Sequence, residues 1–270
     1  MCYNAVDKII IGEKTMDLNK LLKVSTLAGK IMLESGAETY RVEETISRIC
    51  TSFGAHTADS FVIPTGIIVT VTYNDEVATL VKRITSRGVD LNKIDRINDL
   101  SRKIQGENIP IYDFYEELVK ISKSTRYSFL ATLLWSSIAA GCFSIMFGGD
   151  IKDFFVATFI GAVIKIGEII FEKLDINEFF VNSVCGGLCA LLAAISIKLN
   201  LCSNLDKTII GAIMLLVPGL TITNAIRDTI AGDFLSGITK ASEAFLVAVS
   251  IAVGTGAMLS ILITSLGISM

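Results

Sequence analysis

The chain of 270 residues has few of the residues on which enzyme active sites are commonly built. His56 is its only histidine, and neither HExxH nor GxSxG occurs. The six cysteines include no CxxC pair, and four of them lie in or beside apolar stretches, where we expect small packing residues. The phosphate-binding pattern GxxxxGK[ST] is also missing, which argues against an ATP-driven pump. We therefore expect no catalytic residue, no metal and no cofactor, and a structural role for His56.

Charge is scarce in the second part of the chain. Residues 1–126 hold 17 Lys+Arg and 17 Asp+Glu, whereas residues 127–270 hold only 7 and 10. A helix needs about 20 apolar residues to cross a hydrocarbon core of roughly 30 Å. Five stretches approach or meet that length: 127–149, 154–171, 179–197, 208–226 and the uncharged tail after Glu243. The sequence predicts a polytopic α-helical membrane protein with about five transmembrane helices in residues 127–270, preceded by a cytoplasmic α+β domain in residues 1–126.

The orientation follows from the ends of the chain and from the short connectors. The first residues have no apolar core followed by a small-residue cleavage site, so we expect a cytoplasmic N-terminus. The connectors expected inside hold Lys173, Arg227 and Lys240, against Lys152 and Lys207 outside. This small excess agrees with the positive-inside rule. Five spans then place the C-terminus outside, in a multi-pass protein of the cell membrane.

The N-terminal block changes its hydrophobic period twice. Apolar residues recur at helical spacing after Asp17, a candidate N-cap, as far as Gly36, and again through residues 38–54. Residues 67–73 alternate in polarity, which predicts a strand of a small antiparallel sheet, and helical spacing returns from Leu91 onward. We expect two packed helices, a sheet and two further helices.

Several charges of the second predicted helix lie three to four residues apart. Glu38 and Glu44 are spaced in this way from Arg41 and Arg48, and Glu43 lies on the same predicted helix. Such spacing allows surface ion pairs along one helix. We expect a solvated face.

The fourth apolar stretch contains Pro218 and Gly219 near its middle. Proline cannot donate the backbone hydrogen bond to Met214, so we expect this span to kink or break. A new half-helix would begin after the break, and its positive dipole end would attract a carboxylate. Thr221, Thr223 and Asn224 could supply hydrogen bonds to a small amino acid or carboxylic acid. A proline kink without functional role is the alternative.

Ionisable residues follow this break and also lie within one apolar stretch. Asp228, Asp233 and Glu243 could bind or relay protons, or they could be solvated loop charges. Lys165 and Glu168 are three residues apart in 154–171, so mutual pairing would lower the cost of burying them. That pair is consistent with a structural role or with a role in transport.

Three segments carry a resemblance to a known family. They are SGAETYRVEETISRICTSFG (35–54), FVIPTGIIVTV (61–71) and LLVPGLTITNAIRDTIAGDFLSGITKASEAFLVAVSIAVG (215–254), and together they resemble the threonine/serine exporter family. Within it the chain is similar to the larger subunit of the split form, whose relatives include proteins implicated in succinate export. The resemblance implies a proton-coupled secondary exporter. It also implies that Pro218, Gly219, Thr221, Thr223 and Asn224 bind substrate, while Asp228, Asp233 or Glu243 handles the proton.

The partners follow from the same comparison. Fused members of the family carry about ten spans in one chain, whereas this chain has about five. A second, smaller polytopic membrane subunit of about 150 residues is therefore expected. The other expected partners are a small-molecule substrate and membrane lipid, with oligomerisation possible and no nucleic acid. The alternatives are a membrane-anchored regulatory or sensor subunit and a membrane-bound hydrolase.

Overall fold

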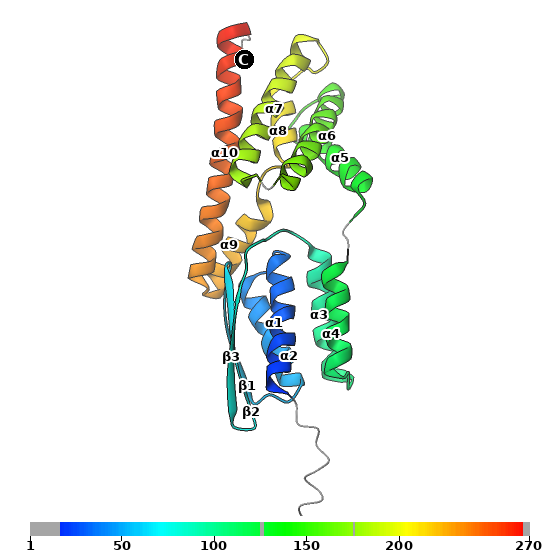
Figure 1. The fold of residues 1–270 in the computed structure, drawn as a ribbon. Coiled ribbons are helices and arrows are strands. Elements are labelled where there is room, and N and C mark those ends of the chain that lie inside the picture. The colour runs from blue at the N-terminus through cyan, green and yellow to red at the C-terminus, as the bar shows by residue number, and fades with distance from the viewer. Residues whose placement is uncertain (1–16, 125–126, 175, 267–270) are drawn as a thin grey trace, which may run out of the picture. The chain divides into compact units, whose positions relative to one another are not determined.

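The computed structural model describes residues 17–124, 127–174 and 176–266, which form two compact units (Figure 1). Among these residues the first unit contains 17–124 and 223–240, and the second contains 127–222 and 241–266. The segment 223–240 thus packs with the first unit although it follows most of the second in sequence. The two chain ends, on which the predicted orientation rests, lie outside the described residues. The predicted domain boundary at residue 126 stays a prediction.

The first unit begins with two helices, α1 (Leu18–Glu34) and α2 (Thr39–Ser52). The Asp17 carboxylate caps α1 by accepting from the Asn19 N–H at 3.0 Å, as the sequence predicted. Gly36 follows the end of α1 with φ of 86°, in the left-handed region that favours glycine. The helices pack closely, since a Cβ on Gly29 would lie 2.6 Å from Cδ1 of Ile46. The predicted helix pair is therefore confirmed.

A three-stranded antiparallel sheet follows the helix pair. Its strands are β1 (Thr57–Ile63), β2 (Gly66–Tyr73) and β3 (Glu76–Arg83), in the order β1-β2-β3. Ile67, Val69 and Val71 of the central strand are fully buried, as the alternation predicts. Helices α3 (Leu91–Gly106) and α4 (Ile111–Lys123) complete the order. The pair α1–α2 lies between the sheet and α3–α4, so the unit has three layers around one core (Figure 1).

Among the described residues, four helices are long and apolar enough to cross a membrane. They are α5 (Phe129–Met146), α6 (Ile151–Lys173), α7 (Glu178–Lys198) and α10 (Phe234–Leu266), the last qualifying over Phe234–Thr264. The stretch 208–226 is not one helix. It divides into α8 (Leu205–Ile213) and α9 (Gly219–Ala231), with residues 214–218 between them. The predicted break at Pro218 is confirmed, and the polytopic helical fold is established, whereas the count of five spans stays a prediction.

Small residues allow the helices of the second unit to approach closely. A Cβ on Gly161 of α6 would lie 2.7 Å from the Cβ of Ala140 of α5. A Cβ on Gly254 of α10 would overlap the main-chain carbonyl oxygen of Ser183 of α7. Such small-residue contacts are typical of membrane helix packing. Cys185 and Cys189 are fully buried in the same core, which confirms their expected packing role.

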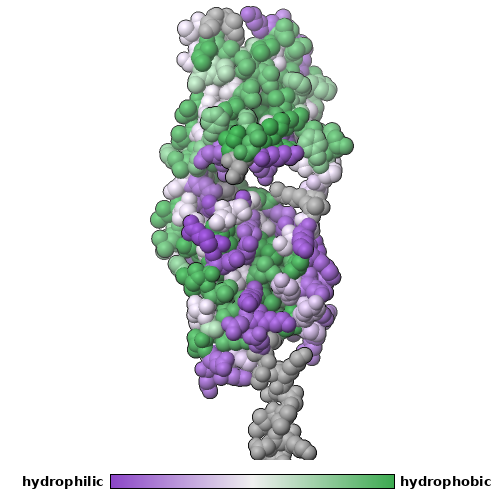
Figure 2. All heavy atoms as spheres, in the orientation of Figure 1, coloured by the Kyte–Doolittle hydropathy of each residue, from purple (hydrophilic) through white to green (hydrophobic). Residues whose placement is uncertain are grey.

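The outer surface of the second unit is strongly apolar. Figure 2 shows hydrophobic residues over most of its visible face, whereas hydrophilic residues are mixed into that of the first unit. Large side chains such as Trp135, Phe159 and Phe245 are 70%, 61% and 67% exposed. Exposed apolar area on this scale is suited to lipid rather than to water.

A buried carboxylate joins two connectors of the second unit. Asp153 is fully buried near the start of α6, where it forms a capping box with Asp150. Its side chain also accepts hydrogen bonds from the Ser203 and Asn204 N–H groups at 2.8 and 3.0 Å. The α5–α6 and α7–α8 connectors therefore meet at one end of this unit.

Candidate functional site

A buried ion pair lies where α9 contacts the start of α2 in the first unit. The Thr39 N–H and Oγ1–H both donate to the Asp228 carboxylate at 3.0 Å, to Oδ1 and Oδ2 respectively. The Nζ of Lys240 lies 2.7 Å from Asp228 Oδ2 and donates to the Ala37 carbonyl at 3.3 Å. Asp228 is fully buried and the Lys240 side chain is only 9% exposed. We call Thr39, Asp228 and Lys240 the Asp228 cluster.

Asp228 lies where the first N–H groups of α2 need a hydrogen-bond acceptor. The first N–H groups of a helix lack partners within the helix, and its N-terminus favours negative charge. The N-cap residue Glu38 makes no capping hydrogen bond with its own side chain. The carboxylate of Asp228, 189 residues further along the chain, supplies that acceptor instead. Asp228 therefore caps α2 from α9.

Glu38 forms a second ion pair beside the cluster. Its carboxylate lies 2.6 Å from Nη1 of Arg227 and 3.3 Å from Nε of Arg41. Burial opposes ionisation of Glu38, but a backbone N–H and these two arginines outweigh it and hold the pKa of Glu38 below its usual value. Glu38 is only 6% exposed, so the expectation of a solvated position was wrong. The reason is tertiary, because α9 covers this end of α2.

Two further acids lie near Asp228. Burial raises the pKa of Glu43, and the charges of Asp233 and Asp228 add to the rise, although the Val62 N–H donates to Glu43 at 2.8 Å. Burial likewise raises the pKa of Asp233, and the Asp228 charge raises it further against the opposing charge of Lys240. Glu43 is half-buried, which corrects the solvated assignment. Only Glu44 is exposed as expected, in an ion pair with Arg48.

One predicted substrate residue belongs to this site. The Nδ2 of Asn224 donates to the Gly36 carbonyl at 2.8 Å, while its Oδ1 is buried without a hydrogen-bond partner among the described residues. A buried amide oxygen with no partner is costly and points to a missing ligand or water. Thr223, on the same helix, is exposed. Asn224 is therefore the predicted binding residue with a buried acceptor that a solute could use.

The other predicted site residues fall in the second unit. Pro218, Gly219 and Thr221 lie at or just after the break, and Glu243 is half-buried in α10. Lys165 and Glu168 of α6 form an ion pair, with Nζ 2.8 Å from Oε2. These residues belong to the second unit and the Asp228 cluster to the first, so a joint role stays a prediction.

Sequence reasoning missed several members of the site, above all Lys240, Thr39 and Glu43. A signal for Lys240 was present, because Ser236 and Lys240 are four residues apart near the start of a helix that is largely apolar after Glu243. Both are buried, and the Ser236 hydroxyl donates to the Val62 carbonyl at 3.5 Å. No comparable pattern marked Glu43. Its burial depends on residues that pack against it from distant parts of the chain.

Metal chemistry has no visible support within the described residues. There, no group of three or more His, Cys, Asp or Glu side chains is placed to hold a metal ion. His56 is exposed, and its neighbourhood contributes nothing to the Asp228 cluster.

Comparison with known proteins now identifies the family. The ThrE family model of threonine/serine exporters matches residues 23–262. The chain is 24% identical over 247 residues to "Threonine/serine exporter" of Corynebacterium glutamicum, covering 87% of this chain and 50% of that protein. It is 20% identical over 247 residues to "Probable threonine/serine exporter" of Mycobacterium tuberculosis, covering 90% and 46%. It is also 20% identical over 238 residues to "Probable succinate transporter subunit YjjP" of Escherichia coli, covering 86% and 91%.

The chain thus spans about half the length of the two threonine/serine exporters and most of the length of the succinate transporter subunit. No solved structure matches it. Because the family model covers most of the chain, which also carries four helices able to cross a membrane, the chain belongs to the threonine/serine exporter family.

Proposed function

We propose that the chain is one subunit of a secondary exporter for a small amino acid or carboxylate, and that it works with a smaller polytopic membrane subunit. The relatives that it matches by half their length are named threonine/serine exporters. The relatives that it matches nearly end to end are named subunits. A separate chain of about 150 residues would supply the remaining spans. We place the complex in the cell membrane with the N-terminus of this chain inside.

The break between α8 and α9 is the observation that carries this proposal. Residues 214–218 interrupt a stretch that would otherwise be long enough to span. Within a membrane, non-helical backbone is tolerated only where it faces protein or a water-filled cavity. Broken helices in secondary transporters bind solutes at such points, with the N-terminus of the second half-helix directed at a carboxylate. The start of α9, with Gly219 and Thr221, fits that role.

The chemistry further along α9 adds polar groups for binding and for proton transfer. The buried Oδ1 of Asn224 can accept a hydrogen bond from an ammonium or hydroxyl group of the solute. The raised pKa values of Asp233 and Glu43 make these acids better proton acceptors than ordinary carboxylates. Asp228 lies 2.7 Å from the Nζ of Lys240, so its role in this proposal is to shape the site and to act on the neighbouring acids through its charge.

Reconstitution tests the proposal. The chain with its small partner in liposomes should move threonine, serine or succinate, and the chain alone should move them at least tenfold more slowly. Pro218→Ala and Asn224→Ala should insert at parental levels and lose flux, while the exposed control His56→Gln should keep it. Equal flux with and without the partner would refute the two-subunit arrangement. If both site variants kept the parental flux, Pro218 and Asn224 would not be part of the substrate site.

The proton step needs its own measurement. Asp233→Asn should remove most of the pH dependence of flux, because an amide keeps the shape but does not titrate. Asp228→Asn should instead mainly lower the thermal midpoint of the protein, because it breaks the buried ion pair with Lys240. If the pH profile of Asp233→Asn matched the parent, the acid would be Glu43, Glu243 or a residue of the partner.

A further inference from the structure

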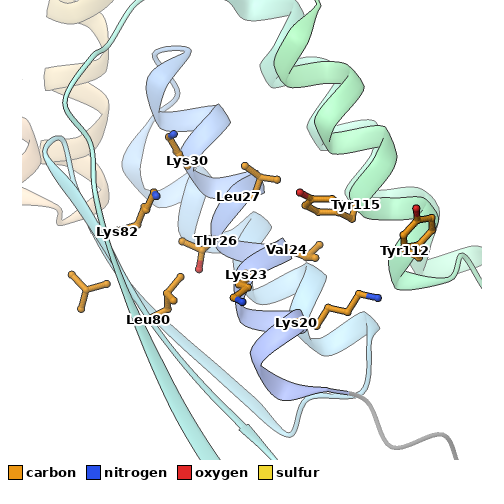
Figure 3. Close-up of a pocket in the computed structure, with 11 residues that line it drawn as sticks. Lys20, Lys23, Val24, Thr26, Leu27, Lys30, Leu80, Lys82, Tyr112 and Tyr115 are labelled. Carbon is orange, nitrogen blue, oxygen red and sulfur yellow. The ribbon is translucent and has the colours of Figure 1, made fainter.

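A cavity of about 620 Å³ lies within the first unit, between α1, β3 and α4. Its walls include Val24 and Leu27 of α1 and Leu80 of β3, and the rings of Tyr112 and Tyr115 close it on the α4 side (Figure 3). None of the Asp228 cluster lines it. This volume is within the range of small-molecule sites, which are mostly apolar with a few placed polar groups.

The charge of the lining is entirely of one sign. Lys20, Lys23 and Lys30 from three turns of α1, together with Lys82 from β3, surround the cavity, and no carboxylate is among its described lining residues (Figure 3). Lys30 is 3.6 Å from the half-buried carboxylate of Glu34, but no acidic side chain of the described residues pairs with Lys23 or Lys82. Like charges around one concavity raise the local potential and attract anions.

A buried hydroxyl is the second, independent sign of a missing ligand. Thr26 lines the cavity and is 2% exposed, yet its Oγ1 has no hydrogen-bond partner among the described residues. Threonines in helices commonly donate to the carbonyl four residues earlier, as Thr45 does here to Arg41 at 2.9 Å. Thr26 does not, so its donor is left for a group inside the cavity.

We propose that this cavity binds an organic phosphate. Four ammonium groups match a polyanion with two or more phosphate charges, since lysine is a common phosphate ligand. The aliphatic wall and the two tyrosine rings accommodate an organic body, such as a sugar or a base, and Lys20 already lies 5.5 Å from the ring centre of Tyr112.

Helix α1 connects the cavity to residues of the proposed transport site. Helix α1 forms one wall of the cavity and ends at the turn whose Gly36 and Ala37 carbonyls accept hydrogen bonds from Asn224 and Lys240. A ligand that ties α1 to β3 restrains the helix that carries this turn. The site is therefore placed to regulate the subunit rather than to carry its substrate.

Titration calorimetry on the full chain in phosphate-free dodecyl maltoside micelles tests the site, with ATP as the probe. We expect saturable binding that weakens as salt is added, because exposed charges are screened. Lys23→Ala and Lys82→Ala should each weaken binding about tenfold, since charge-assisted hydrogen bonds are the strong ones. The matched control Lys103→Ala, an exposed lysine of α3 away from the cavity, should leave binding unchanged.

Thr26→Val separates a ligand role from a structural one. Loss of an unpaired hydroxyl should leave the thermal midpoint unchanged or higher, while ATP affinity falls about fivefold and Thr26→Ser restores it. A lower midpoint with parental affinity would make the hydroxyl structural and overturn its place in the site.

Two further probes identify the source of the phosphate. Inorganic triphosphate should bind more weakly than ATP if the organic body contacts the tyrosines. Binding of soluble dihexanoylphosphatidylglycerol in place of ATP, with the same dependence on Lys23 and Lys82, would assign the site to a lipid headgroup. No saturable binding of any probe, or equal weakening by Lys103→Ala, would overturn the proposal.

Discussion

Breaking the ion pair between Asp228 and Lys240 should destabilise the first unit strongly, whereas removing both charges should not. The pair joins Nζ and Oδ2 at 2.7 Å, with the aspartate fully buried and the lysine side chain 9% exposed. In Lys240→Met the carboxylate keeps only the two donors of Thr39. In Asp228→Asn the ammonium keeps the Ala37 carbonyl at 3.3 Å. Either variant leaves an uncompensated charge inside the protein.

The expected magnitude follows from that geometry. Removing one partner of a buried pair costs about 3–5 kcal/mol, while replacing both with well-packed neutral groups is often neutral or stabilising. At about 2–4 °C per kcal/mol for chains of this general size, each single variant should lose roughly 6–20 °C in thermal midpoint. The double variant Asp228→Asn/Lys240→Met should recover most of that loss, because no charge is then left alone.

A thiol-reactive dye reports the transition in detergent. Cys50 is fully buried in the first unit and becomes reactive only when that unit unfolds, while the exposed Cys142 sets the baseline. The fully buried Cys185 and Cys189 report the second unit separately. Lys120→Met serves as the control, because it breaks an exposed ion pair with Glu117 and should leave the midpoint unchanged. Single variants within 2 °C of the parent, or a double variant as unstable as both singles combined, would refute the reasoning.

The pKa of Glu43 is higher in the folded protein than in the unfolded chain, so protonation of Glu43 favours the folded state. This contribution to the free energy of unfolding is present below pH 4.5, the ordinary pKa, and is lost as the pH rises through the raised folded pKa. The thermal midpoint of Glu43→Gln should therefore exceed that of the parent at pH 8 by more than at pH 4, and a constant difference would argue against the raised pKa. Gly254→Ala should destabilise the chain, because the new Cβ overlaps a main-chain carbonyl oxygen of α7 that cannot move cheaply. Gly256→Ala, with no atom within 4 Å of its Cβ, should be neutral or slightly stabilising in thermal melts, and equal behaviour of the two would contradict the packing. Alkaline phosphatase fused after Met270 should be active in a bacterial host and inactive after Lys123, and the reverse pattern would invert the topology.

Local features of the chain were readable from sequence because their causes are local. The Asp17 cap, the left-handed glycine after α1 and the alternation in β2 each depend on residues within a few positions of one another. The same holds for the break at Pro218, since a missing N–H and a ring clash act on the same turn. Lengths of apolar sequence marked α5, α6, α7 and α10 as helices able to span a membrane.

The site depended on contacts that no local pattern encodes. Glu38 has the spacing of a surface charge and Glu43 lies on the same helix, and only the packing of distant segments buries both and moves their pKa values in opposite directions. Lys240 contacts both Asp228 and the Ala37 carbonyl, and Ala37 lies 203 residues before Lys240 in the sequence. The sequence by itself determined the helices, the strands, the break and the apolar spans, because backbone sterics, helix periodicity and hydrophobic length act over a few turns. Only the tertiary structure decided which charges are buried, which pairs form and where a lysine-lined cavity opens, because burial and Coulomb energy depend on which segments meet in space.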